Sequence, residues 1–186
     1  SGAGTGHNTN EIDMNGKTLN IYKGFSINNV SLKLTGSGTL NLCRNCSNQE
    51  TAGIKSTGTG GITVASGISM NSASLITLEL HDSTTLTSSG NITNNNSVAV
   101  WVYGGNININ GGTINAKYYG ISKGPSSTGN STIKVTNGTL ITNGNTSSAP
   151  VFCGNNTSST CNVTISGGTF RSSGNAVSFQ DTNSTY

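Results

Sequence analysis

The feature that most constrains the fold of this chain is a short motif that recurs along its length. Each copy has two aliphatic residues that flank a polar one, then a turn of Gly, Asn, Ser or Asp, and then Thr followed by an apolar residue. Six copies are clear, and they begin at Ile12, Leu32, Leu78, Ile107, Ile133 and Val163. A seventh copy, over 62–70, is weaker and leaves its register open by several residues. Because apolar and polar residues alternate in every copy, the motif predicts short β-strands with one buried face.

Most copies are followed by a third short apolar segment, found at 52–54, 99–102, 120–121, 149–152 and 176–179. Three strands per repeat predict an all-β, single-stranded parallel β-helix, a β-solenoid of about seven coils in which equivalent strands stack at ~4.8 Å. The apolar residues after the Thr would then form one core column, made of Leu19, Leu40, Leu86, Ile114, Leu140 and Phe170. A sandwich of β-hairpins is the alternative fold. It explains less, because a sandwich does not need one motif repeated in one direction.

The composition argues against helical and doubly wound folds. Ser, Thr, Asn and Gly together supply 107 of the 186 residues, and only 31% of the residues are hydrophobic. These small residues favour turns and extended chain over helix interiors. A disordered tract is the other interpretation, but disorder usually combines low hydrophobicity with high net charge, and this chain carries only +3. We therefore expect a flexible lead-in or linker over 1–10 and one β-solenoid domain over 11–186.

Three copies of the motif resemble the coils of a known group of proteins. They read Ile12-Asp-Met-Asn-Gly-Lys-Thr-Leu19, Ile107-Asn-Ile-Asn-Gly-Gly-Thr-Ile114 and Val163-Thr-Ile-Ser-Gly-Gly-Thr-Phe170. These segments are similar to coils of secreted microbial right-handed parallel β-helix proteins. That group has a pectate-lyase-like fold and includes surface adhesins and calcium-dependent, pectin-binding carbohydrate-binding domains. The resemblance runs from about residue 11 to residue 180 and rests on core and corner residues, so it implies the architecture and the right-handed coil more specifically than a function.

The four cysteines form two local pairs, Cys43 with Cys46 and Cys153 with Cys161. Two such pairs could also hold zinc through their thiolates. The pairs are far apart in a rod-like fold, however, so one shared metal is disfavoured. A redox-active Cys-x-x-Cys needs an activated thiolate, typically at a helix N-terminus, and the sequence predicts no helix. We therefore predict two disulfides, each closing a loop in an oxidising compartment.

The disulfides favour a secreted, extracellular or cell-surface protein. No apolar run approaches the ~20 residues of a membrane-spanning helix, so we expect no membrane insertion. Eleven Asn-x-Ser/Thr sequons occur, against about eight expected by chance from this composition. If the source organism glycosylates asparagine, the predicted loop sites Asn145, Asn155 and Asn156 are the best candidates.

The sequence offers little catalytic chemistry, because the whole chain contains six acidic residues. Hydrolytic and lytic sites need clustered carboxylates, as an acid/base pair or as calcium ligands. The one dense group is Glu79, His81 and Asp82, which we interpret as a solvated strand followed by a turn. We expect no catalytic residue, cofactor or metal. The predicted outward ladder has mixed charge and consists of Asp13, Lys33, Glu79, Asn108, Lys134 and Thr164.

Aromatic residues supply the candidate ligand-binding site. Alternation in 98–103 places Trp101 and Tyr103 on the face opposite the valines, and Tyr118 and Tyr119 occupy the same stage of the next coil. Exposed rings of this kind can stack on sugars. The alternative is that they pack under the segment 124–130. Nucleic acid is disfavoured as a partner, because the nine basic residues are dispersed rather than gathered in a stripe.

The ends of the predicted solenoid suggest how the chain functions. Neither end shows an amphipathic capping helix, and an uncovered coil exposes strand edges and apolar core. The chain could be part of a longer tandem protein, or copies could stack head to tail into filaments. Our first hypothesis is a non-enzymatic extracellular structural protein, a fibre subunit or adhesin stalk that forms homo-oligomers in this way. The rival is a carbohydrate-binding module that recognises a polysaccharide, acidic or neutral, on one solenoid face.

Overall fold

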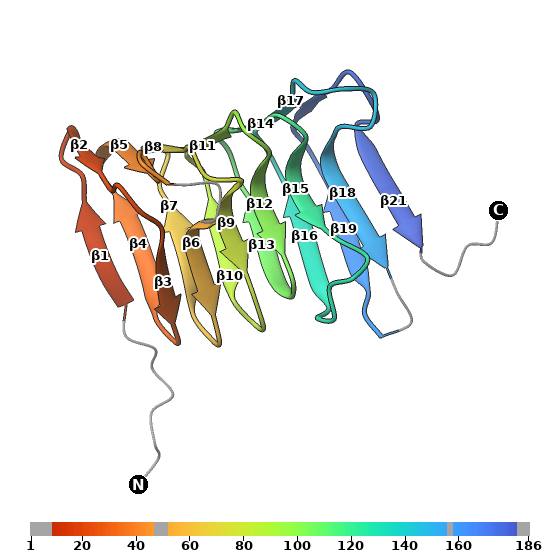
Figure 1. Ribbon diagram of the computed structural model, residues 1–186, viewed down its shortest axis with the longest axis horizontal. Coiled ribbons are helices and arrows are strands. Elements are labelled where there is room, and N and C mark those ends of the chain that lie inside the picture. The colour runs from red at the N-terminus through yellow and green to blue at the C-terminus, as the bar shows by residue number, and fades with distance from the viewer. Residues whose placement is uncertain (1–8, 47–51, 156–157, 182–186) are drawn as a thin grey trace, which may run out of the picture.

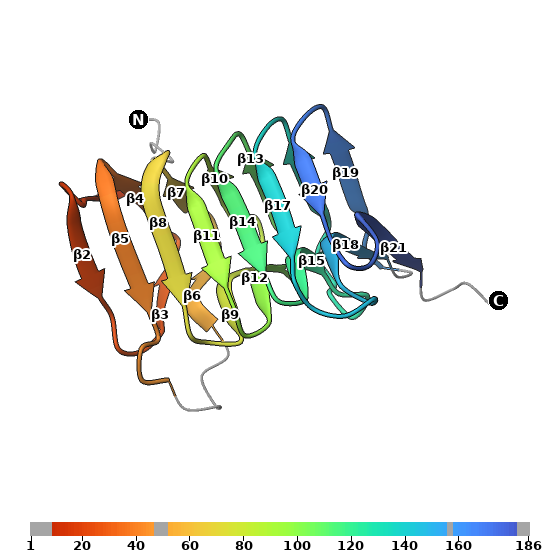
Figure 2. The same cartoon turned by 90° about the horizontal axis from the view of Figure 1, so that it is seen from above.

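A computed structural model describes residues 9–46, 52–155 and 158–181 of the chain. Within these ranges every regular element is a β-strand, and 21 strands form three parallel sheets of seven strands each (Figures 1 and 2). The first strand begins at Thr9, two residues before the predicted start of the solenoid. The remainder of the predicted lead-in, 1–8, lies outside the described residues.

The three sheets, here named A, B and C, each take one strand from every coil. Sheet A contains, in spatial order, β1 (Thr9–Asp13), β4 (Ser31–Thr35), β7 (Gly61–Val64), β10 (Thr85–Ser88), β13 (Gly105–Ile109), β16 (Ser131–Val135) and β19 (Cys161–Ile165). Sheet B contains β2 (Lys17–Asn20), β5 (Ser37–Leu42), β8 (Gly67–Ser72), β11 (Asn91–Asn94), β14 (Thr113–Ala116), β17 (Thr139–Thr142) and β20 (Thr169–Arg171). Sheet C contains β3 (Phe25–Asn28), β6 (Ala52–Thr57), β9 (Ile76–Leu80), β12 (Val98–Val102), β15 (Tyr119–Lys123), β18 (Ala149–Asn155) and β21 (Val177–Asp181).

Consecutive strands always enter different sheets, and each strand pairs in parallel with the strand three places later in the chain. This is the predicted all-β, single-stranded parallel β-solenoid with three strands per coil. With seven strands in each sheet, the chain completes about six turns. Figure 2 shows the strands of sheet B side by side along the length of the rod. The fold prediction is therefore confirmed.

The core column of sheet B differs from the predicted column in the middle of the chain. It runs through Leu19, Leu40, Met70, Ile92, Ile114, Leu140 and Phe170. Leu86, which we predicted in this column, is buried in β10 of sheet A instead. The copy that begins at Leu78 joins the end of one coil, β9, to the start of the next, β10. The weaker copy over 62–70 follows the regular order, because its two strands, β7 and β8, are the sheet A and sheet B strands of one coil.

The outward ladder of sheet A also differs from the prediction. It consists of Glu11, Lys33, Thr63, Thr87, Asn108, Lys134 and Thr164. Two predicted members were wrong: Asp13 lies beside Thr35, and Glu79 belongs to sheet C. Glu11 accepts hydrogen bonds from the Thr35 hydroxyl at 2.7 Å and from the Lys33 ammonium at 3.3 Å. These two donors, together with the positive charge of Lys33, hold the pKa of Glu11 below its usual value.

Glycine at the corner between sheets A and B lets the coils stack closely. Gly112 has a φ of +71°, and a Cβ at this position would lie 2.0 Å from the carbonyl oxygen of Gly90 in the preceding coil. Any side chain would therefore strain the backbone and separate the two coils. The recurrent Gly of the motif is thus a requirement of stacking as well as of the turn.

Candidate functional site

The outer face of sheet C carries a group of polar and aromatic side chains from β6, β9, β12 and the turns after them. Lys55, Glu79 and Trp101 are neighbours across three strands. The buried Glu79 carboxylate lies 3.2 Å from the Lys55 ammonium and accepts a hydrogen bond from His81 at 2.6 Å. The His81 ring stacks on Tyr103, with centroids 4.4 Å apart and planes 13° from parallel. The fold therefore places Glu79 beside Trp101 and His81 against Tyr103, although the members of each pair are far apart in the sequence.

Trp101 packs under the segment that follows β15. A Cβ at Gly124 would lie 2.8 Å from the Trp101 ring, and Gly129 donates its N–H to the carbonyl oxygen of Tyr103 at 2.9 Å. The indole Nε1 is buried and has no hydrogen-bond partner among the described residues. This is the packing alternative of the sequence analysis, and it leaves the ring only partly accessible for stacking on a sugar.

Tyr118 and Tyr119 form separate contacts. The Tyr119 ring tilts against Phe152 with centroids 5.1 Å apart, and the Lys117 ammonium lies 4.9 Å above the Tyr118 ring. No ring contact links these two tyrosines to Trp101 within the described part of the chain. The four aromatic residues predicted as one patch therefore occupy two places.

Glu79 and Lys55 form an ion pair within the protein. The Glu79 carboxylate already has two donors, and the ring of His81 is held flat against Tyr103. Among the described residues, no three His, Cys, Asp or Glu side chains come close enough together to hold a metal ion. The contacts tie β6, β9 and the turn after β9 to one another.

The second candidate surface is the B/C edge, which we define as the C-terminal ends of the sheet B strands together with the described residues of the turns that lead into sheet C. It begins with a ladder of side-chain amides on adjacent coils. Asn41 donates to Asn20 at 2.9 Å, and Asn71 donates to Asn41 at 3.1 Å. Arg44 also donates to the Asn20 side chain, at 3.2 Å. This ladder was not predicted from the sequence, although an Asn follows the core residue in each of these three coils.

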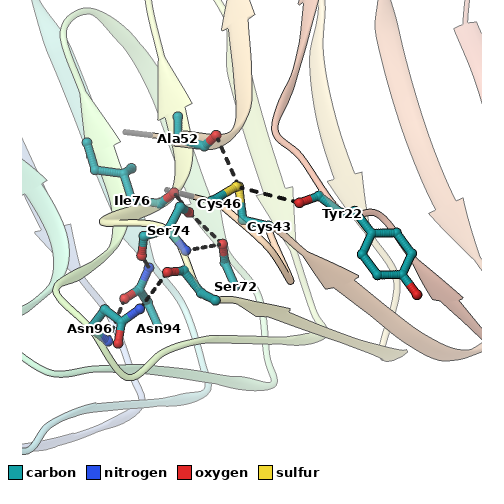
Figure 3. Close-up of a disulfide and its surroundings, with 10 residues drawn as sticks. Tyr22, Cys43, Cys46, Ala52, Ser72, Ser74, Ile76, Asn94 and Asn96 are labelled. Atoms are coloured by element: carbon teal, nitrogen blue, oxygen red, sulfur yellow. Dashed lines mark hydrogen bonds between the residues drawn. A yellow bond between two sulfur atoms is a disulfide. The ribbon is translucent and has the colours of Figure 1, made fainter. Parts of the chain in front are cut away.

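The first disulfide, Cys43–Cys46, forms as predicted and closes the turn that carries Arg44 (Figure 3). The amide of Cys46 donates to the carbonyl oxygen of Cys43, and that of Arg44 to Ile21 in the preceding coil. Figure 3 shows the Tyr22 ring directed away from the disulfide, and this side chain is exposed. The disulfide therefore fixes the turn from which Arg44 reaches back to the amide ladder.

The second predicted disulfide, Cys153–Cys161, also forms and links β18 to β19. Beside it, the side chain of Lys123 is fully buried. Its ammonium donates to the carbonyl oxygens of Ser127 and Gly154 at 3.3 and 3.0 Å, and to the hydroxyl of Ser159 at 2.9 Å. Three acceptors match the three N–H groups of a lysine. Burial nevertheless lowers the pKa of Lys123.

Two open depressions lie at equivalent places on the B/C edge. One, of about 310 Å³, is lined by Asn41, Arg44 and Asn71 together with Leu42, Ser72 and Ala73. The other, of about 540 Å³, includes Asn143 and Arg171 in its lining. They lie between β5 and β8 and between β17 and β20, four strands apart in sheet B and hence about 19 Å apart. Each depression combines an arginine with side-chain amides.

The predicted glycosylation sites have different surroundings. Asn145 is exposed in the turn after β17, where its side-chain oxygen accepts the N–H of Ser147. Asn155 is the last residue of β18 rather than a loop residue, and Asn156 lies outside the described residues.

Comparison with known proteins gives no match, whether with protein-family models, curated proteins or solved structures. The expected β-helix fold is present in the structure itself. Nowhere in the described ranges is there a helix long and apolar enough to cross a membrane.

Proposed function

We propose that this chain is a non-enzymatic extracellular structural protein, a fibre subunit or adhesin stalk whose solenoids stack head to tail. The observation that carries the proposal is the exposure of core columns at both end coils. Leu19 in β2 is 37% exposed, and Ile165 in β19 and Phe179 in β21 are 43% and 64% exposed. Inner members of the three columns, such as Met70 in sheet B, Val135 in sheet A and Cys153 in sheet C, are fully buried. A further coil on each end would bury these side chains.

The two end coils have compatible sequences. Continuing the register of the solenoid across a junction would set Phe170 of one copy against Leu19 of the next, and Ile165 against Ile12. On the outer face of sheet B, Thr169 would meet Thr18. Strand edges at the junction would pair as they do within the solenoid. Because the contact joins two different surfaces, it generates open filaments.

The extracellular location is part of the proposal, as is kinship with secreted microbial β-helix proteins. Two disulfides in a chain of this size are compatible with an oxidising compartment, since they are rare where thiols are kept reduced. The sparse surface charge also supports association, because few like charges would repel one another at a junction.

Negative-stain electron microscopy and light scattering over a concentration series test the proposal. We expect rods that lengthen as the concentration rises, with a constant width. A species that stays monomeric at every concentration would contradict head-to-tail stacking.

A second candidate function is carbohydrate binding at the B/C edge. The two open depressions favour it, because amide and guanidinium groups can donate several hydrogen bonds to sugar hydroxyls. A glycan array probed with the parent chain, Asn71→Ala and Trp101→Ala separates the two candidate surfaces. Loss of binding in Asn71→Ala alone would place the ligand at the B/C edge, and loss in Trp101→Ala alone would favour sheet C.

A further inference from the structure

We propose that Asn137 is a site of spontaneous deamidation, in which the backbone nitrogen of Gly138 attacks the asparagine side chain and the product loosens the stacking of the sixth coil. Both residues lie in the corner between β16 and β17. The inference is independent of the proposed function, because all the reacting protein groups belong to one copy of the chain.

The reaction requires no enzyme and no cofactor. The main-chain nitrogen of the residue after asparagine loses its proton to solvent base and forms a bond to the side-chain carbon Cγ. Ammonia leaves from that carbon, and a cyclic imide remains. Water then opens the ring at either carbonyl, which gives aspartate or isoaspartate, so that the net change is uptake of water and release of ammonia. Deamidation of this kind is fastest where glycine follows, because glycine has no Cβ to crowd the attacking nitrogen.

The structure holds the reacting groups of Asn137 and Gly138 together. The Gly138 N–H donates to Oδ1 of Asn137, with 2.8 Å between nitrogen and oxygen. The nitrogen therefore lies beside Cγ, the carbon that carries this oxygen, and the hydrogen bond polarises the same carbonyl group. Groups held in this way react without first having to find one another. Asn137 is exposed, so water reaches the imide.

Three other asparagines precede a glycine, namely Asn15, Asn110 and Asn143. All four pairs lie in described residues and all four asparagines are exposed, so access to water does not distinguish them. Their hydrogen bonds do. The N–H after Asn15 donates to a carbonyl oxygen of the second coil at 2.6 Å. The Asn110 side chain accepts the Thr136 hydroxyl at 3.1 Å, and the Asn143 side chain donates to Asn115 at 2.8 Å. These contacts tie the nitrogen or the side chain to a neighbouring coil instead.

The corner that contains Asn137 connects three coils. The Thr139 N–H donates to the carbonyl oxygen of Gly112 in the fifth coil at 2.9 Å, and the Gly138 carbonyl oxygen accepts the N–H of Thr169 in the seventh coil at 2.8 Å. A Cβ at Gly138 would lie 3.0 Å from the Gly112 oxygen, so the corner has little spare room. Isoaspartate routes the main chain through the former side chain and adds one carbon just before Gly138. We expect this to disturb both hydrogen bonds.

Peptide mapping by mass spectrometry follows the reaction in the folded chain during incubation at mildly alkaline pH. We expect modification at position 137 to be at least about tenfold faster than at positions 15, 110 and 143. Both aspartate and isoaspartate should form, with one oxygen taken from isotope-labelled water. The rate should rise with pH, because attack requires the deprotonated nitrogen. In the chain unfolded by urea the four rates should become similar, since glycine follows at every site.

Two variants test the site and its consequence. Asn137→Gln keeps the amide on a longer side chain, whose larger ring closes more slowly, and should stop modification at this position. Asn143→Gln is the matched control, because it alters another exposed Asn-Gly pair and should leave the reaction at position 137 unchanged. The thermal midpoint of the parent chain should fall as isoaspartate accumulates, and the midpoint of Asn137→Gln should stay constant over the same incubation.

Several results would overturn the proposal. Equal rates at the four sites of the folded chain, or a faster reaction at position 15, 110 or 143, would remove the assignment to Asn137. The same follows if position 137 stays unmodified in the folded chain while the unfolded chain reacts. Modification without a fall in the thermal midpoint would leave the site in place and overturn its effect on stacking. Circular dichroism checks the fold of both variants, and the rates in the parent chain decide the site even if a variant misfolds.

Discussion

If copies stack head to tail, Phe179 should be one of the main contributors to the junction. Its side chain is 64% exposed in the last coil. A phenylalanine has about 200 Å² of surface to bury, so stacking would remove about 130 Å² from water. At ~25 cal/mol per Å² this contributes about 3 kcal/mol to association. Replacement by serine should therefore weaken association by about two orders of magnitude.

Sedimentation velocity over a concentration series measures this change for Phe179→Ser. Leu75→Ser provides the matched control, because Leu75 is also an exposed apolar residue but lies in the turn before β9, in the middle of the rod. We expect filaments to shorten or disappear in Phe179→Ser and to persist in Leu75→Ser. Thermal unfolding should change little in the Phe179 variant, since the side chain makes few contacts within one copy. Unchanged association in Phe179→Ser, or an equal loss in Leu75→Ser, would refute the reasoning.

Three further predictions concern the stability of a single copy. Ile92→Ala removes a fully buried side chain from the sheet B column and should lower the free energy of unfolding by about 2 to 5 kcal/mol in denaturant titrations. Burial lowers the pKa of Lys123 below 10.5, so the folded chain binds fewer protons than the unfolded chain over the pH range between the two pKa values. Stability should therefore rise with pH toward 10.5, and the slope should be smaller in Lys123→Met, as measured by unfolding at a series of pH values. Replacing Cys153 and Cys161 by alanine opens a loop of about nine residues and should cost about 2 to 3 kcal/mol, whereas an unchanged denaturation midpoint would contradict a structural role for this disulfide.

The candidate surfaces show where prediction from sequence succeeded. Both disulfides were predictable because each pair is local, and a short separation leaves few alternative partners. The outward orientation of Trp101 and Tyr103 followed from alternation. The contact between Tyr103 and His81 did not, because His81 belongs to the preceding coil and reaches Tyr103 only when the coils stack. The amide ladder was missed for the same reason, since Asn20 and Asn41 are 21 residues apart and Asn41 and Asn71 are 30 apart.

The sequence by itself determined the architecture: strands of period two, turns rich in Gly and Asn, and too few apolar residues for any thick core. It also determined which residues are apolar enough to enter the core. Only the tertiary structure decided the phase of the repeat. Apolar and polar residues alternate in the same way in the strands of all three sheets, so the local pattern does not distinguish Leu86 of sheet A from Ile92 of sheet B. The coils also differ in length, so counting residues along the chain does not assign each strand to its sheet. Stacking resolves the ambiguity, because parallel hydrogen bonding and core packing are satisfied together in only one register, and that register places the basic and amide side chains along the B/C edge.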